Sequence, residues 1–151
     1  MNRPPRFASQ SPPRPLEIFS IRISDEDLQL ITASLRRTYG DLLRISIGGT
    51  LALPMQAYNP SRDQYDAEVL LDYLLTVKHK ELTLWVIPED LYARDMNFLF
   101  GLASPFRGAL LSLYRLPTTD LKEKEAIHEV GHVMGLKHCP NRCVMRFSNS
   151  L

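Results

Sequence analysis

The sequence predicts a single α/β domain, and three observations support that fold class. Apolar segments of strand length alternate with amphipathic segments of helix length through most of the chain. The segment 82–87 is apolar on both faces, as is typical of a central parallel strand covered by helices on each side. The chain has 151 residues, of which 44% are hydrophobic, and this fits one ordinary domain with a short tail.

Charge and composition exclude several classes of function. Eighteen Lys and Arg against 17 Asp and Glu leave a formal charge of +1, so we expect no nucleic-acid or membrane surface built on bulk charge. No stretch approaches the roughly 20 apolar residues of a transmembrane helix, and the N-terminus lacks the apolar block of a signal peptide. The sequence therefore predicts a cytoplasmic protein, and we expect a monomer.

The first 15 residues differ in composition from the rest. They contain five of the 11 prolines, three arginines and no acidic residue, which disfavours both a helix and a central strand. We therefore expect residues 1–15 to form a loosely ordered arm and residues 16–151 to form the domain. A polyproline ligand or a basic handle for a partner is the alternative to a plain tail.

The elements are predicted from hydrophobic periodicity and from the residues that begin and end them. The first helix has a capping Ser24, acidic residues in its first turn, where the helix dipole favours them, and a terminating Gly40. In order, the predicted elements are a strand of about eight residues from Leu16, a helix from Ser24 to Gly40, a strand over 42–47, a helix over about 62–78, strands over 82–87, 98–103 and 109–114, and a last helix starting near Thr119.

The last predicted helix carries the string HEVGHVMGLKH. At 100° per residue, His128 and His132 lie about 40° apart on one face of this helix. Ile127, Val130 and Met134 lie on nearly the opposite face, so core packing would hold the helix while both imidazoles face a cleft.

The residues around the two histidines complete a pattern of metal ligation. Glu129 falls about 60° from His132, within reach of a water on a metal but poorly placed to be a ligand itself. Gly135 is suited to the left-handed conformation that ends a helix, and the turn brings His138 back toward the other two histidines. The histidines could instead be satisfied in a core or on the surface, but the spacing makes a metal site the favoured interpretation.

Three neutral imidazoles leave a fourth position open for water, as in a catalytic rather than a structural zinc site. Zinc lowers the pKa of that water toward ~7, and Glu129 would take its proton during attack on a peptide carbonyl and then pass it to the departing amine. Imidazole sites also accept cobalt, nickel or copper, so zinc is inferred from the ligand set and from the resemblance described next.

Further segments of the chain carry a family resemblance. They are AYNPSRDQY at 57–65, EDLYARDMNFLFGLASP at 89–105, SLYRLP at 112–117, and HEVGHVMGLKHC running into CVM at 128–145. With these segments the sequence resembles the metzincin zinc peptidases and, more narrowly, the archaemetzincin family. The resemblance implies a metzincin-like mixed sheet of about five strands, with an active-site helix carrying HExxH and a Met-turn.

The resemblance also implies roles for individual residues. It places a catalytic zinc on His128, His132 and His138, assigns Glu129 as general base, and puts Met145 in the Met-turn beneath the site, although Met145 could be an ordinary core methionine. It further implies an antiparallel edge strand whose free backbone groups pair with an extended substrate, unless a loop covers that edge. This strand comprises Phe98, Leu99, Phe100, Gly101, Leu102 and Ala103.

The two cysteines leave open whether the chain binds a second zinc. In the family, four thiolates form a structural zinc site, with four residues between the first two cysteines and a C-x-x-C pair downstream. Here three residues separate Cys139 from Cys143, and these 151 residues contain no such pair. The two cysteines supply half of a site, which water, a histidine or a neighbouring molecule would have to complete.

The sequence thus predicts a zinc-dependent metallopeptidase that acts on peptides through a zinc-bound water, with Glu129 as general base. The alternative is a zinc-binding protein of the same fold that has lost peptidase activity and serves a structural or interaction role. Neither prediction includes nucleic acid or a membrane as a partner. A further possibility is that the arm of residues 1–15 recruits a partner protein.

Overall fold

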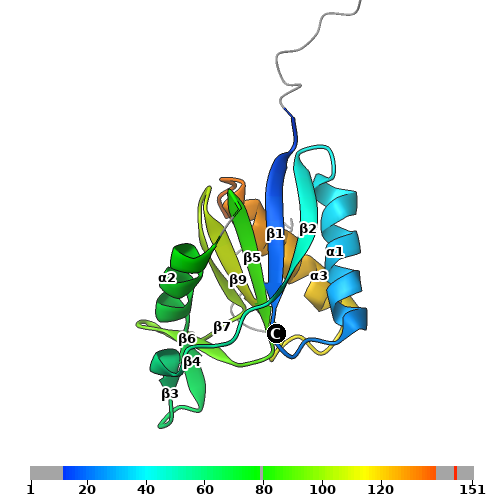
Figure 1. Ribbon diagram of the computed structural model, residues 1–151. Coiled ribbons are helices and arrows are strands. Elements are labelled where there is room, and N and C mark those ends of the chain that lie inside the picture. The colour runs from blue at the N-terminus through cyan, green and yellow to red at the C-terminus, as the bar shows by residue number, and fades with distance from the viewer. Residues whose placement is uncertain (1–11, 79, 139–144, 146–151) are drawn as a thin grey trace, which may run out of the picture.

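The computed structural model describes residues 12–78, 80–138 and 145. A five-stranded sheet forms the centre, in the order β2-β1-β5-β9-β8, and helices lie on both of its faces (Figure 1). Its strands are β1 (Arg14–Ser20), β2 (Leu43–Thr50), β5 (Leu82–Ile87), β8 (Gly101–Ser104) and β9 (Gly108–Ser112). The predicted α/β class is confirmed.

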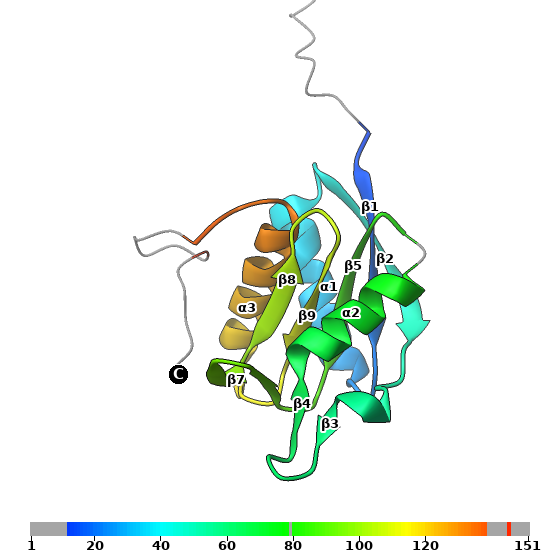
Figure 2. The same ribbon diagram turned by 90° about the vertical axis from the view of Figure 1, so that its left-hand side faces the viewer.

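Helices α1 (Asp25–Tyr39) and α3 (Thr119–Val133) pack together on one face of this sheet, and α2 (Ala67–Val77) covers the other (Figure 2). Strand β5 has alternate side chains in the two cores: Leu84 and Val86 face α1 and α3, while Trp85 and Ile87 face α2. All six residues of β5 are buried, which confirms the prediction of a central strand covered on both faces. Among the described helices, none has the length and apolarity needed to cross a membrane.

The sheet is mixed. β1 pairs in parallel with β2 and β5, and β9 pairs in parallel with β5. β8 is antiparallel to β9 and occupies the edge of the sheet, with Gly101 opposite Leu111 and Ser104 opposite Gly108. Because α3 packs against β8 and β9, this antiparallel edge lies beside the helix that carries the histidines.

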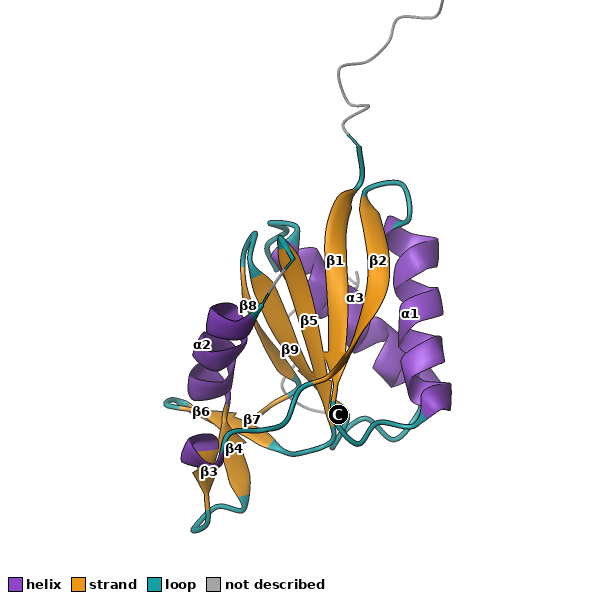
Figure 3. Ribbon diagram, in the orientation of Figure 1, coloured by secondary structure: helices purple, strands orange, loops and turns teal. Residues whose placement is uncertain are grey.

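A second, small sheet lies beyond one end of the main sheet (Figure 3). It has the order β3-β4-β6-β7 and consists of β3 (Tyr58–Asn59), β4 (Gln64–Asp66), β6 (Leu91–Ala93) and β7 (Met96–Leu99), preceded by a 3-10 helix, η1 (Met55–Ala57). The sequence did not predict β3, β4 or β6, because strands of two or three residues are too short to show a periodicity.

Two predicted starting points are wrong, and the first of them has a local cause. The second helix begins at Ala67 rather than near residue 62, because the Asp66 carboxylate caps it by accepting from the backbone N–H groups of Glu68 and Val69. The first strand begins at Arg14 rather than at Leu16 and ends at Ser20, so the end of the predicted arm belongs to the sheet. Residues 1–11 of that arm lie outside the described part of the chain.

The predicted strand over 98–103 is in fact two strands. Phe98 and Leu99 belong to β7 in the small sheet, and Gly101 to Ala103 belong to β8 in the main sheet. Phe100 separates them: its side chain is 4% exposed, and its carbonyl accepts from the Ser112 backbone N–H at 2.8 Å. An unbroken apolar run contains no signal for such a change of sheet.

The side chain of Tyr39 links α1 to α3. The tyrosine is buried, and its hydroxyl donates to the Ile127 carbonyl at 2.8 Å, one residue before the first histidine of the string. We expect Tyr39→Phe to lower the free energy of unfolding by about 1 kcal/mol, because the buried hydrogen bond is lost while the ring is kept. Urea denaturation measures this, with Tyr114→Phe on an exposed tyrosine as the control. Equal unfolding curves for the two variants would contradict the assignment.

Candidate metal centre and cleft

Helix α3 is held by packing on the side away from the cleft. The Thr118 hydroxyl caps its start by accepting from the Leu121 backbone N–H at 3.2 Å. Val130 and Ala126 are fully buried, and Ile127 packs against the same core. The predicted apolar face is therefore confirmed, and it leaves His128 and His132 on the cleft side of the helix.

The first two histidines lie within contact distance of each other. Their Nε2 atoms are 3.1 Å apart, and their ring centroids are 4.6 Å apart. Nδ1 of His132 lies 2.8 Å from the Leu136 carbonyl, which can only accept. The Nδ1–H of His132 therefore donates there, and Nε2 keeps the lone pair that binds a metal.

The turn after α3 brings in the third histidine. Gly135 has φ +92°, in the left-handed region that was predicted for it. The Leu136 backbone N–H donates to the Gly131 carbonyl and the Gly135 N–H donates to the His132 carbonyl, both at 2.9 Å. This turn brings the His138 ring to centroid distances of 4.5 Å from His132 and 5.3 Å from His128.

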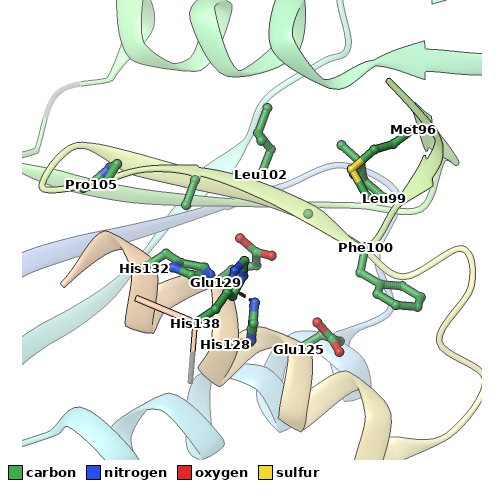
Figure 4. Close-up of a pocket in the computed structure, with 12 residues that line it drawn as sticks. Met96, Leu99, Phe100, Leu102, Pro105, Glu125, His128, Glu129, His132 and His138 are labelled. Carbon is green, nitrogen blue, oxygen red and sulfur yellow. Dashed lines mark hydrogen bonds between the residues drawn. The ribbon is translucent and has the colours of Figure 1, made fainter. Parts of the chain in front are cut away.

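The three histidines fit a metal ion. One ring nitrogen from each lies within 4.8 Å of those of the other two, and Figure 4 shows the rings converging below strand β8. Partial burial, and next the neighbouring His132, lower the pKa of His138, which favours the neutral imidazole that ligates metals. A set of nitrogen donors alone suits zinc and other late transition metals rather than calcium or magnesium.

Glu129 lies between α3 and the edge strand. Its side chain is 5% exposed, and burial, with a smaller contribution from the charge of Glu125, raises its pKa to about 8. A Cβ at position 101 would come within 2.8 Å of the Glu129 carboxylate carbon and closer still to the Leu110 carbonyl. Glycine at 101 therefore allows β8 to approach the Glu129 carboxyl group. The sequence spacing alone did not indicate this contact.

The sequence analysis missed Glu125. Its side chain is 3% exposed, lines the cleft, and has a carboxylate oxygen within 4.8 Å of both a His128 nitrogen and a Glu129 oxygen. Burial raises the pKa of Glu125 as well. Its position in the sequence could have indicated this role. Glu125 precedes His128 by three residues, so on a helix the two lie on the same face about one turn apart.

The remaining predicted residues fall into two groups. Met145 is 6% exposed, and its sulfur packs against Gly131 of α3, the helix that carries His128 and His132. Cys139 and Cys143 lie outside the described residues, so the second metal site remains a prediction.

The cleft runs along β8 above the histidines and has a volume of about 270 Å³. Its lining combines the edge strand β8, helix α3 and the end of the small sheet. The lining residues are Met96, Leu99, Phe100, Gly101, Leu102, Ala103, Pro105, Glu125, His128, Glu129, His132 and His138. Five of the six residues predicted for the edge strand line it; Phe98 instead packs edge-on against the ring of Phe100.

Comparison with known proteins places this arrangement in a family. The family model described as Peptidase family M54 matches residues 39–151. An archaemetzincin from Nanoarchaeum equitans (strain Kin4-M) is 52% identical over 101 residues, covering 67% of this chain and 59% of that protein. An archaemetzincin from Archaeoglobus fulgidus is 48% identical over 104 residues, covering 64% and 63%. The chain thus spans less than two thirds of the length of these two relatives.

Solved structures agree with the sequence matches. The crystal structure of archaemetzincin from Methanopyrus kandleri matches with a TM-score of 0.81 and 34% identity, covering 95% of this chain and 86% of that one. A zinc-dependent peptidase from Methanocorpusculum labreanum (strain Z) matches with a TM-score of 0.76 and 25% identity, covering 89% and 88%. By sequence and by fold, the chain belongs to peptidase family M54, the family of the archaemetzincins.

Proposed function

We propose that this protein is a zinc-dependent peptidase that hydrolyses peptide bonds in the cleft beside β8. The observation that carries the proposal is the convergence of three imidazoles next to a buried carboxyl group, at the edge of a sheet. The family match and the similarity to a zinc-dependent peptidase of known structure support it.

Each residue of the site has a distinct task. His128, His132 and His138 would hold the zinc, which when bound acidifies water and polarises a carbonyl group. Glu129 takes the proton of the attacking water and delivers it to the departing amine, and its burial against β8 keeps bulk water from competing for that proton. Met145, whose sulfur packs against Gly131, would support the helix as the Met-turn residue.

The substrate would bind as an extra strand. β8 pairs with β9 along one of its edges and forms the end of the five-stranded sheet. An extended peptide can therefore hydrogen-bond to the opposite edge of β8 and lie over the histidines. This mode of binding depends on the backbone, so it accepts many sequences and leaves selectivity to the side chains of the cleft wall.

Replacing Glu129 by Gln tests the proposed base. We expect Glu129→Gln to retain zinc and to lose at least about a hundredfold in kcat, because the amide is nearly isosteric but takes no proton. Glu68→Gln, on an exposed residue in the first turn of α2, is the matched control. Turnover of Glu129→Gln at the parent rate would refute the mechanism.

Metal content tests the ligand set and the open cysteine question. We expect one zinc per chain when Cys139 and Cys143 are both replaced by Ser, and loss of this zinc when His132 is replaced by Ala, because two imidazoles bind zinc far more weakly than three. Elemental analysis gives the ratio of metal to protein. A second zinc that disappears with the cysteines would establish the second site.

Assays of the zinc-loaded protein distinguish the peptidase from a zinc-binding protein of the same fold that has lost hydrolysis. A zinc-loaded chain that cleaves no member of a broad peptide library, with and without a chelator, would support a zinc-binding protein that has lost hydrolysis. Cleavage that stops on addition of the chelator and returns with zinc would exclude it.

A further inference from the structure

Three sequence segments outside the zinc string meet in one polar network at the end of the cleft. They are the segments at 57–65, 89–105 and 112–117, which are separated along the chain and were singled out for their family resemblance. Their side chains connect β4, the β6–β7 hairpin and the loop between β9 and α3. The proposed chemistry uses none of these polar side chains.

Asp90 is the centre of this network. Its side chain is 7% exposed, and both of its carboxylate oxygens accept from Arg115, Nε to Oδ1 and Nη2 to Oδ2, at 2.9 Å each. The amide nitrogen of Gln64 donates to Oδ2, also at 2.9 Å. Two parallel hydrogen bonds from one arginine and a third from another donor fix the position and the orientation of the carboxylate. Removal of one partner of such a buried pair lowers stability, because it leaves an uncompensated buried charge.

The network continues from Asp90 to strand β7. Nε2 of Gln64 also donates to the Asn97 carbonyl at 2.8 Å, and Arg62 donates to the Gln64 amide oxygen at 2.8 Å. The Arg115 guanidinium lies 4.2 Å from the centroid of the Phe98 ring. The hairpin is therefore held at its base by Asp90 and along β7 by contacts to Asn97 and Phe98.

The anchored hairpin contributes Met96 and Leu99 to the wall of the cleft. Figure 4 shows these two side chains close together at one end of the strand that crosses the site, with Pro105 at the other end. Among the described lining residues, those around this end are apolar, and the carboxyl side chains in the lining are Glu125 and Glu129. Such a wall favours an apolar side chain of the substrate and disfavours an acidic one.

We propose that the β6–β7 hairpin is the specificity element of the cleft. Met96 and Leu99 form the wall of a subsite that takes an apolar side chain of an extended peptide close to the scissile bond. Asp90 and Arg115 are positioning residues that hold this wall against β8. The inference rests on the proposed peptidase function, which it deepens by naming the class of substrate.

Replacing an apolar residue of the cleft wall by an acidic one tests the proposed subsite. We expect the parent enzyme to prefer Leu, Met or Phe over Asp by at least about tenfold in kcat/KM at one position near the cleaved bond. Met96→Glu should reduce that preference about tenfold and raise cleavage of peptides with Lys or Arg at the same position, because the new carboxylate pairs with them. Cleavage-site profiling of a peptide library measures every position at once.

Met55→Glu is the matched control for this substitution. Met55 is 72% exposed in η1 and does not line the cleft, so the same exchange there should leave the profile unchanged. Zinc-dependent cleavage without an apolar preference at any position, or a Met96→Glu profile equal to that of Met55→Glu, would overturn the specificity assignment while leaving the peptidase function in place.

The positioning role of Asp90 requires a different measurement. Asp90→Asn keeps the shape of the side chain but removes the charge that the Arg115 fork binds, so the hairpin loosens. We expect KM for the preferred peptide to rise about tenfold and kcat to change less than threefold, with zinc content unchanged. Asp72→Asn, on the exposed face of α2, is the control. A fall in kcat alone, or no change in KM, would refute the positioning role.

A second variant and a binding measurement cover the cases in which Asp90→Asn does not fold or the parent cleaves no peptide. If Asp90→Asn does not fold, Arg115→Lys keeps the charge and loses only the fork, and a smaller rise in KM in the same direction is expected. Binding of the preferred peptide to zinc-loaded Glu129→Gln, followed by fluorescence anisotropy, reports on the subsite without turnover. If the zinc-loaded parent chain cleaves no peptide, selective binding by Glu129→Gln that an added Met96→Glu abolishes would retain the subsite and reject the peptidase. No selective binding by Glu129→Gln and no cleavage by the parent would reject both.

Discussion

The close packing of α3 against the edge strand β8 is the constraint on which the site depends. A Cβ at position 101 would come within 2.8 Å of the Glu129 carboxylate carbon, so the strand approaches the helix this closely because Gly101 has no side chain. On its other side the helix is held by fully buried Val130 and by the Tyr39 hydroxyl. The buried carboxyl, the open strand edge and the histidines are brought together by this single contact.

The convergence of the three histidines depends on a more local geometry. Two histidines lie one turn apart on α3, and the third follows a turn that a left-handed glycine makes possible. The Leu136 carbonyl, in that same turn, accepts from His132 and orients its ring. The turn thus supplies the third histidine of the group and also sets the tautomer of His132.

The far end of the cleft combines two kinds of contact. The small sheet shares the apolar core on the α2 face, in which Leu91 and Leu99 are buried. It is also joined to the body of the protein by charged and amide side chains around Asp90. Strands of two to four residues bury little apolar surface each, and these directional hydrogen bonds add to the apolar packing at the point where the hairpin forms the cleft wall.

The sequence by itself determined the α/β class, the helix over Asp25–Tyr39, the buried central strand, and the convergence of three histidines beside a carboxyl group, because each rests on a local period, cap or spacing. The tertiary structure alone decided that residues 98–103 change sheets at Phe100. It also decided that Glu125 shares the site. These outcomes depend on which strand, carbonyl or carboxyl group lies opposite a residue, and contacts between segments distant in the chain leave no periodic trace in either segment.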